Sequence, residues 1–367
     1  MLKAAVCTVG ATSALLILAA VPAQAGSNHT IWVEPGTGTI SAAVDRANPG
    51  DTLRLKVGTY RDSVSIEKTL TIKGSGWRTV LVPPDTRPLN NCNVVAEQQG
   101  KTPGAEEGIC ALGGIGPQGP DFNNRIKNVR VSDLYVHGFN DIGVLGFNTD
   151  GLRVWNVKSD NNTGYGIARF ESVNSVFEEN STSQNGEAGL YMGDSPNANS
   201  VVRDNSTDHN GFGIFFRDSS FQTAQDNKVW GNCVGVMALN TGSGGTPAAD
   251  VGNFTMEDNK IFANNKACPT GDVPAVSGVG VALLGVKNSQ VKDNDITGHQ
   301  ASGPSFLSGG VVVAQLQDGT APSGNKIIDN ELNHNRPADI VTDGSDKTLV
   351  VRDNDCRSLP NHRCTAG

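Results

Sequence analysis

Three acidic residues recur at matching positions in the middle of the chain: Glu171, Asp194 and Asp218, with Asn148 and Asn240 at the flanking positions. Each follows a short apolar segment, so we expect them to stack in a column at the ends of adjacent strands. Neighbouring carboxylates repel each other unless they share a cation or a proton. The column therefore predicts either a Ca²⁺ site formed by the three acids or a general acid and base. The alternative is turn chemistry, because Asp side chains also cap backbone amides.

Two further polar side chains lie near this column in the sequence. Arg217 directly precedes Asp218 and could bind the carboxyl group of a uronate sugar. His209 could exchange a proton near neutral pH, although His334 occupies the equivalent place in a later repeat. We therefore add Arg217 and His209 to the three acids as predicted catalytic residues.

An apolar column precedes the acids and is predicted to point outward, where a sheet that faces water would be polar. Its members include Tyr191, Phe215 and Met237, and Phe170 belongs to a second outward column two residues further along the strands. Either a loop covers this face, with residues 83–124 as the expected segment, or the rings contact sugar or another apolar ligand. These four side chains are the predicted substrate contacts.

Arg169 falls in the inward-pointing column of the same strands, among aliphatic and aromatic residues. A buried, unpaired guanidinium would be costly, so we expect the strand to bulge there or Arg169 to meet a carboxylate. Arg169 is also a predicted substrate contact.

The elements that position these residues are short repeats. Counted between Asn156, Asn180, Asn205 and Asn227, the intervals are 24, 25 and 22 residues, which is one coil of a three-sheet solenoid. A second Asn column lies five residues further on, and stacked Asn side chains can hydrogen-bond from coil to coil. This second column comprises Asn161, Asn185, Asn210, Asn232, Asn264 and Asn335, with His299 in one coil.

These repeats predict an all-β fold, a right-handed parallel β-helix in three sheets, as one domain over residues 26–367. A short helix over 39–48 is suited to capping the open end. Residues 83–124 are rich in Gly and Pro and are predicted to leave the coil as a long excursion. Segments 266–278 and 299–309 should form adjacent walls, and residues 355–367 a C-terminal cap.

The segment from Ile40 to Gly74, with Pro49-Gly50-Asp51 and Gly58-Thr59-Tyr60, resembles the first turns of pectate-lyase-like β-helix proteins. That resemblance implies the β-helix fold and extended carbohydrate as a ligand. The catalytic signatures of the superfamily do not map, however. Asn148-Thr149-Asp150 and Arg125-Ile126-Lys127 resemble two polygalacturonase motifs, but their order is reversed and Gly-His-Gly is missing.

The N-terminus has the pattern of a secretory signal peptide over residues 1–25: one Lys, an apolar run from Ala11 to Val21, then Ala23-Gln24-Ala25. The run is too short to span a membrane. Without this segment 28 basic residues stand against 37 acidic ones, a net charge of −9. This charge argues against nucleic acid as a partner. An acidic polymer would require a local basic patch or a bridging cation, and no charge run shows either.

Six cysteines remain after the signal segment, an even set that suits an oxidising compartment, either extracellular or periplasmic. Their positions in the sequence favour three local disulfides, and no zinc-ligand spacing competes with them. The expected pairs are Cys92 with Cys110, Cys233 with Cys268, and Cys356 with Cys364.

Three functions follow from these observations. The first is a secreted enzyme, a lyase or epimerase, that binds an extended polysaccharide in a groove and uses Ca²⁺ as its only expected cofactor. The second is a cyclase, isomerase or binder for an apolar small molecule on the strip around Tyr191 and Phe215. The third is a non-catalytic surface or matrix protein.

Overall fold

The computed structural model describes residues 28–98, 104–242, 251–270, 274–316, 319–358 and 364. The predicted signal segment lies outside the described residues, as does most of the predicted C-terminal cap. Among the helices that the structure does describe, none is long and apolar enough to cross a membrane.

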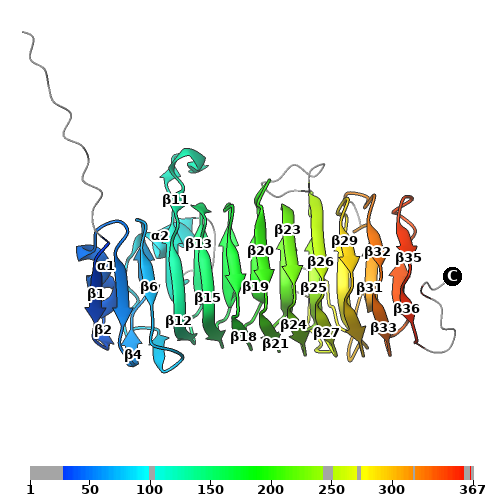
Figure 1. Ribbon diagram of the computed structural model, residues 1–367, viewed down its shortest axis with the longest axis horizontal. Helices are drawn as coiled ribbons and strands as arrows, with labels where there is room; N and C mark the ends of the chain where they lie inside the picture. The colour runs from blue at the N-terminus through cyan, green and yellow to red at the C-terminus, as the bar shows by residue number, and fades with distance from the viewer. Residues whose placement is uncertain are drawn as a thin grey trace, which may run out of the picture.

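Parallel strands stack into a long solenoid with three faces (Figure 1). One face, sheet B, is a separate sheet of ten strands within the described ranges. They are β5 (Val64–Ile66), β8 (Ile109–Leu112), β13 (Val144–Phe147), β16 (Ile167–Phe170), β19 (Ala188–Gly193), β22 (Phe212–Arg217), β25 (Val234–Leu239), β28 (Val279–Leu284), β31 (Gly309–Ala314) and β34 (Ile340–Thr342).

The other two faces form one hydrogen-bonded sheet, sheet A, because β12 and β15 run through the corner between them. Its first face contains β1 (Thr30–Val33), β3 (Thr52–Leu55), β6 (Thr71–Lys73), β12 (Arg130–His137), β15 (Arg153–Asp160), β17 (Val176–Glu178), β20 (Ser200–Arg203), β23 (Ser220–Gln225), β26 (Gly252–Glu257), β29 (Gln290–Lys292), β32 (Lys326–Ile328) and β35 (Val350–Arg352).

The second face takes the far ends of β12 and β15 and the strands that follow the corner. These are β2 (Gly36–Thr37), β4 (Gly58–Arg61), β7 (Thr79–Val82), β18 (Ser181–Ser183), β21 (Ser206–Asp208), β24 (Lys228–Trp230), β27 (Lys260–Phe262), β30 (Asp295–Thr297), β33 (Glu331–Asn333) and β36 (Asp355–Cys356). Two short pairs lie outside the main sheets: β9 (Ile115–Gly116) with β10 (Gly119–Pro120), and β11 (Ile126–Lys127) with β14 (Thr149–Asp150).

Asn side chains connect the coils at the corner between the two faces of sheet A. The Oδ1 atom of Asn205 accepts hydrogen bonds from the backbone N (2.9 Å) and Nδ2 (3.0 Å) of Asn180, and Asn227 does the same for Asn205. These bonds satisfy amides that the turn would otherwise bury unpaired. The predicted first member was wrong by one residue, because Val157, and not Asn156, donates its backbone N–H to Asn180.

The second Asn ladder begins at Asn162 and not at the predicted Asn161, since Asn162 Nδ2 donates to Asn185 Oδ1 at 2.9 Å. His299 replaces Asn in one coil and is buried. Its Nδ1 lies 3.3 Å from the amide N of Asn264, and burial lowers the pKa of His299 to about 4. A neutral imidazole can therefore accept the same bond that an Asn oxygen accepts in the other coils.

The glycines that open the sheet B strands are required by close packing against this ladder. A Cβ on Gly213 would lie 2.5 Å from the Gly235 carbonyl oxygen and 3.0 Å from Asn232 Nδ2. The aliphatic residues that follow them point inward and are fully buried, as predicted. The core therefore runs the whole length of the coil.

The termini and the excursion differ partly from expectation. The predicted capping helix is present as α1 (Thr39–Arg46). Residues 83–124 were expected to leave the coil, but Ile109–Leu112 forms β8, a regular strand of sheet B. The rest carries α2 (Asn91–Gln98) and a 3₁₀ turn, η1 (Phe122–Asn124).

All three predicted disulfides are present. Cys92–Cys110 ties α2 to the outer side of β8. Cys233–Cys268 holds the segment after β27 against sheet B. The predicted walls are adjacent as well, because Ser277 N donates to Ser305 Oγ at 2.8 Å and Ser302 N donates to Ser277 Oγ at 3.0 Å.

Candidate functional site

The predicted acidic column lies where the sheet B strands end. Asn148, Glu171, Asp194 and Asp218 each follow a strand and have φ values of 53°, 52°, 55° and 44°. Asn and Asp tolerate this left-handed conformation, whereas Glu does so less readily. Turn chemistry therefore accounts for Asn148 and the two Asp residues, and because Glu179 of sheet A has the same conformation at φ 55°, backbone conformation alone does not distinguish Glu171 either.

The three acids differ in what their carboxyl groups do. Asp218 is 1% exposed and accepts from Thr241 through both oxygens, at 2.7 Å from the backbone N and 2.6 Å from Oγ1. Its Oδ2 also lies 3.4 Å from Arg217 Nε. Asp218 is thus a turn cap, although it was predicted to be a catalytic residue and a metal ligand.

Glu171 and Asp194 are half-buried, and neither caps a backbone amide of the described chain. The hydroxyl of Tyr191 donates to Asp194 Oδ2 at 3.4 Å. Burial, and then the charge of Asp194, raise the pKa of Glu171 to about 7. Burial is also the main cause that raises the pKa of Asp194. Glu171, with a pKa of about 7, is suited to exchanging a proton near neutral pH, and the carboxyl group of Asp194 is in the adjacent coil.

Two arginines flank this pair. Arg217 ends β22, and its side chain is 35% exposed. Arg125 comes from the segment just before β11, and its guanidinium lies 4.7 Å from the centre of the Phe122 ring. The charge of Arg125 acts on Glu171 and lowers its pKa, in opposition to burial. Arg125-Ile126-Lys127 matches a polygalacturonase motif only out of order, and the pairing of β11 with β14 places Arg125 near the acids.

Arg169 lies inside the coil and is fully buried. Its neighbours in β13 and β19 keep a regular register, so the predicted bulge is absent. Its guanidinium donates to the Gly193 carbonyl at 3.1 Å, to Ser195 Oγ at 2.5 Å and to Gln222 Oε1 at 2.7 Å. Its hydrogen-bond partners are thus neutral groups. Burial lowers the pKa of the guanidinium, and the charges of Asp194 and Glu171 oppose that lowering. A fully buried Arg169 cannot contact a substrate in this conformation. Its hydrogen bonds to Gly193 and Ser195 hold the turn that carries Asp194 from the inside of the coil.

The apolar strip is not an open surface. Tyr191 and Met237 are fully buried, and Phe215 is 5% exposed. The rings of Tyr165 and Phe170 cover Tyr191, with centroid distances of 4.5 Å and 4.6 Å. Helix α2 covers only the N-terminal end of this face, where Cys92 and Val95 pack with Leu112 and Leu145. Of the four predicted apolar contacts, Phe170 retains the most exposure.

A cavity of about 330 Å³ opens beside Arg217. Tyr165 and Glu187, which the sequence did not suggest as site residues, form part of its wall. Burial raises the pKa of Tyr165, and Glu187 contributes to that rise. Both residues precede sheet B strands. Nothing in their sequence spacing indicates that the Tyr165 ring and the Glu187 carboxyl group line the same cavity. The other lining residues are Gly186, Gly211, Phe212, Phe215, Arg217, Leu239, Thr241, Cys268, Pro269 and Thr270.

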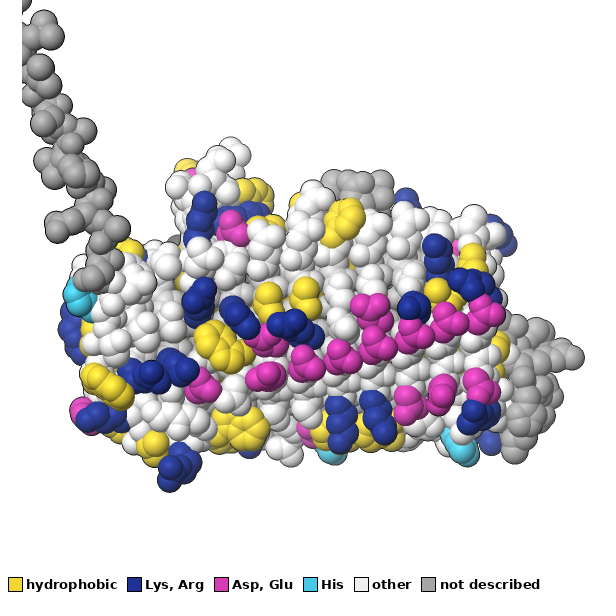
Figure 2. Space-filling view, viewed as in Figure 1, with side chains coloured by type: hydrophobic (Ala, Val, Ile, Leu, Met, Phe, Trp, Pro, Cys, Tyr) yellow, Lys and Arg dark blue, Asp and Glu magenta, His cyan; other side chains and the backbone are white. Residues whose placement is uncertain are grey.

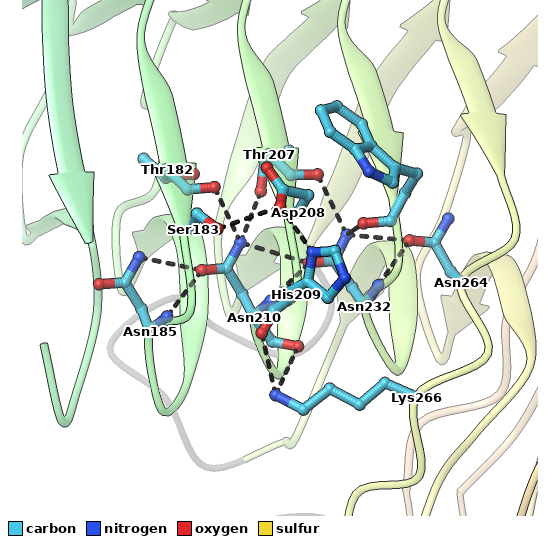
Figure 3. A network of polar contacts seen from close by, with 11 residues as sticks. Thr182, Ser183, Asn185, Thr207, Asp208, His209, Asn210, Asn232, Asn264 and Lys266 are labelled. Carbon is cyan, nitrogen blue, oxygen red and sulfur yellow. Dashed lines mark hydrogen bonds and ion pairs between the residues drawn. The ribbon is translucent and has the colours of Figure 1, made fainter. Parts of the chain in front are cut away.

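His209 lies apart from the acids. It precedes β22, whereas Arg217 ends that strand and Asp218 follows it, so the length of β22 separates His209 from both. Its Nδ1 lies 2.6 Å from Asp208 Oδ2, and its side chain is 60% exposed (Figure 3). His209 and His334 share the same left-handed φ of 55°, which marks a repeat position. The structure does not bring His209 to the predicted site.

The predicted Ca²⁺ site does not fit this arrangement well. Within the described ranges, no three His, Cys, Asp or Glu side chains come close enough to hold a metal ion. Asp218 has both oxygens engaged by Thr241. We therefore derive no chemical step through a metal.

Comparisons with known proteins agree with this fold. The family model of the right-handed β-helix region matches residues 70–248 and 142–318, together more than half of the chain, so the chain belongs to this family. The predicted right-handed parallel β-helix is thereby confirmed. No curated protein matches the sequence.

Several solved structures are similar. The A-module of the Azotobacter vinelandii mannuronan C-5 epimerase AlgE4 has a TM-score of 0.58 at 15% identity, covering 92% of this chain and 99% of that chain. The alginate lyase from Paenibacillus sp. str. FPU-7 has a TM-score of 0.53 at 12% identity, covering 89% and 99%. DFA-IIIase from Arthrobacter chlorophenolicus A6, in complex with GF2, has a TM-score of 0.53 at 13% identity, covering 92% and 97%. At these identities the likeness shows the fold alone.

Proposed function

We propose that the protein is a secreted enzyme that binds an extended acidic polysaccharide across the ends of the sheet B strands and acts on it as a lyase or epimerase. One observation carries the proposal: Glu171 and Asp194 are adjacent, have raised pKa values, and lie between Arg125 and Arg217. Three disulfides fit an oxidising compartment. The named activities of the similar epimerase and lyase structures are consistent with this choice.

The chemistry is proton transfer at the carbon next to a uronate carboxyl group. Arg217, with Arg125, binds that carboxylate and makes the neighbouring C–H bond more acidic. Ionised Asp194 takes the proton, and protonated Glu171 supplies one. In a lyase the electron pair of the C–H bond forms a carbon–carbon double bond, the glycosidic C–O bond breaks, and the leaving oxygen takes the proton of Glu171. In an epimerase Glu171 returns a proton to the opposite face of the same carbon.

The cavity beside Arg217 supports the same polymer as ligand. Its volume is about 330 Å³, and it combines aromatic side chains with Glu187 and Arg217. Sugar rings bind to such mixed surfaces, because their C–H faces pack on aromatic rings and their hydroxyl groups need polar partners. A cyclase, isomerase or binder for an apolar small molecule is less well supported, because Tyr191 and Met237 of the apolar strip that would bind the ligand are buried.

The test is a screen of purified mature protein against polygalacturonate, alginate and hyaluronan, with EDTA and with added Ca²⁺. Ultraviolet absorbance of unsaturated chain ends reports a lyase. Exchange of the sugar proton for deuterium in D₂O, followed by NMR, reports an epimerase. Glu171→Gln and Asp194→Asn should abolish either signal. Absence of both signals with every polymer would reject the proposal and favour the non-catalytic matrix protein.

A further inference from the structure

A second surface with ligand-binding chemistry lies on the first face of sheet A, away from the acid pair. In five successive coils, β1, β3, β6, β12 and β15 place one residue each in a single column, of which four are exposed or half-buried and one, Ser132, is buried. The register is Trp32 to Arg54, Arg54 to Lys73, Lys73 to Ser132, and Ser132 to Trp155. Adjacent members are therefore about 4.8 Å apart.

The indoles of this column lie outside the core. Trp32 is 60% exposed, and the guanidinium of Arg54 lies 5.8 Å from the centre of its ring. Trp155 is half-buried and has Arg153 at 5.3 Å. Trp77, 47% exposed, approaches the same coils, because its Nε1 donates to the Asn156 carbonyl at 3.1 Å. Large aromatic side chains are costly to expose, so three of them on one face suggest a ligand.

The charge of this surface opposes that of the whole protein. Arg54, Lys73, Arg130 and Arg153 lie in these coils, with Arg130 paired to Arg153 in the adjacent column. Asp133 is 3.4 Å from Lys73 Nζ, and Glu178 of the next coil pairs with Arg153. Figure 2 shows Lys and Arg side chains on the N-terminal half of this face and others at its C-terminal end, where a row of acidic side chains accompanies them.

We propose that this surface, the basic track (Trp32, Arg54, Lys73, Arg130, Arg153 and Trp155), is a second, non-catalytic binding site for an extended anionic polysaccharide. The indoles present flat apolar faces to sugar rings, and the arginines pair with carboxylate or sulfate groups. The coil spacing of about 4.8 Å is close to the length of one sugar residue in an extended chain. The choice of a sugar polymer rests on the proposed function, whereas the charge and the exposed indoles do not depend on it.

The experiment is native affinity electrophoresis in gels that contain polygalacturonate, alginate or hyaluronan, with hydroxyethyl cellulose as the neutral polymer. At least one anionic polymer should retard the protein, and the neutral polymer should not. Trp32→Ala combined with Trp155→Ala should weaken that binding about tenfold, as should Arg54→Ser combined with Arg130→Ser. Increasing salt should reduce the retardation, because the contacts are partly electrostatic.

Matched controls come from the same molecule. Trp230→Ala removes an indole with a cation, Lys228, at 4.8 Å, but on the second face of sheet A. Arg352→Ser removes a basic residue from the same column at its C-terminal end. Both should retain retardation, and circular dichroism melts should show that all the variants fold.

Three outcomes would overturn the inference: no retardation by any anionic polymer, equal loss in the controls, or equally strong binding of single-stranded DNA. Activity separates this site from the proposed catalytic one. Glu171→Gln should lose turnover but keep retardation, whereas the track variants should keep turnover of short oligosaccharides and lose efficiency only on long polymer. If the wild type is inactive but still retarded, the catalytic proposal fails and the track stands.

Discussion

The molecule carries two columns of acidic residues in the same backbone conformation, and they have different surroundings. One is the pair Glu171 and Asp194 at the ends of sheet B strands, where the pair is half-buried, Tyr191 contacts Asp194, and the charges of Arg125 and Arg217 act on the two carboxyl groups. The other, the acidic row, follows the corner of sheet A, where every side chain is exposed. Its members, with φ values between 55° and 57°, are Glu179, Asp204, Asp226, Asp258, Asp293, Asp329 and Asp353.

The two columns share a backbone conformation but differ in the burial of their carboxyl groups. A left-handed turn position accepts Asp readily, so the acidic row needs no function to explain its backbone. Water around the row screens its charges. At the sheet B ends, burial removes that water, and the pKa of Glu171 rises to about 7. Residues of the same type therefore differ in pKa where other side chains cover them.

The largest expected difference between the columns is in activity. Glu171→Gln and Asp194→Asn should each lower kcat/KM on the substrate polymer at least about 100-fold, because each removes a proton-transferring group. Asp226→Asn in the acidic row should leave kcat/KM unchanged. Steady-state kinetics of the three variants test this, and equal losses in all three would remove the distinction.

The second difference is in pH dependence. The folded-state pKa of Glu171, about 7, lies above its usual value of 4.5, so the native state binds the proton more tightly than the unfolded state does. Stability from this group is present below pH 4.5 and is lost as the pH rises toward 7. Activity that needs protonated Glu171 should likewise decline above about pH 7.

Melting temperatures of the wild type and Glu171→Gln between pH 4 and 8 measure this effect. The variant should lack the part of the slope that Glu171 causes, and Asp226→Asn should retain it. Parallel slopes in all three proteins would mean that Glu171 titrates as it does in water.

Asp218 should behave as a structural member of its column. Asp218→Ala removes both acceptors for Thr241 and should lower the free energy of unfolding by about 1–3 kcal/mol. Chemical denaturation measures that loss. Asp218→Asn keeps one acceptor and should lose less stability and far less activity than Asp194→Asn. An activity loss as large as that of Asp194→Asn would return Asp218 to the catalytic group.

The smallest effect is expected in the acidic row itself. Asp226→Asn keeps a residue that tolerates the left-handed turn, so the free energy of unfolding should change by less than about 0.5 kcal/mol. Asp226→Val should destabilise the protein more, because a β-branched residue is strained at positive φ. Equal effects of the two substitutions would show that charge, and not backbone conformation, selects Asp here.

Much of the fold was predictable because a solenoid contact joins residues one repeat apart. The Asn ladders, the inward aliphatic positions and the three disulfides all follow from that regularity. The error at Asn156 arose because β15 runs through the corner with Val157 where later coils have Asn, and the error at Asn161 followed from counting five residues onward from Asn156.

The site was only partly predictable. The sequence identified Glu171, Asp194 and Arg217, since they recur at one repeat position. It missed Arg125, which comes from an irregular segment, and Tyr165 and Glu187, which precede sheet B strands at positions where other coils have different residue types. It also missed the basic track, because Arg54, Lys73 and Arg130 are far apart in the chain and become neighbours only when the coils stack.

The amino-acid sequence by itself determined the coil, its length and the side on which each strand residue lies, because local turn chemistry and a period of two fix these features residue by residue. Only the tertiary structure decided which carboxyl groups lose contact with water, which aromatic rings are covered and where positive charge collects. Burial and electrostatic potential are sums over neighbours from many coils, and a repeat pattern does not contain those sums.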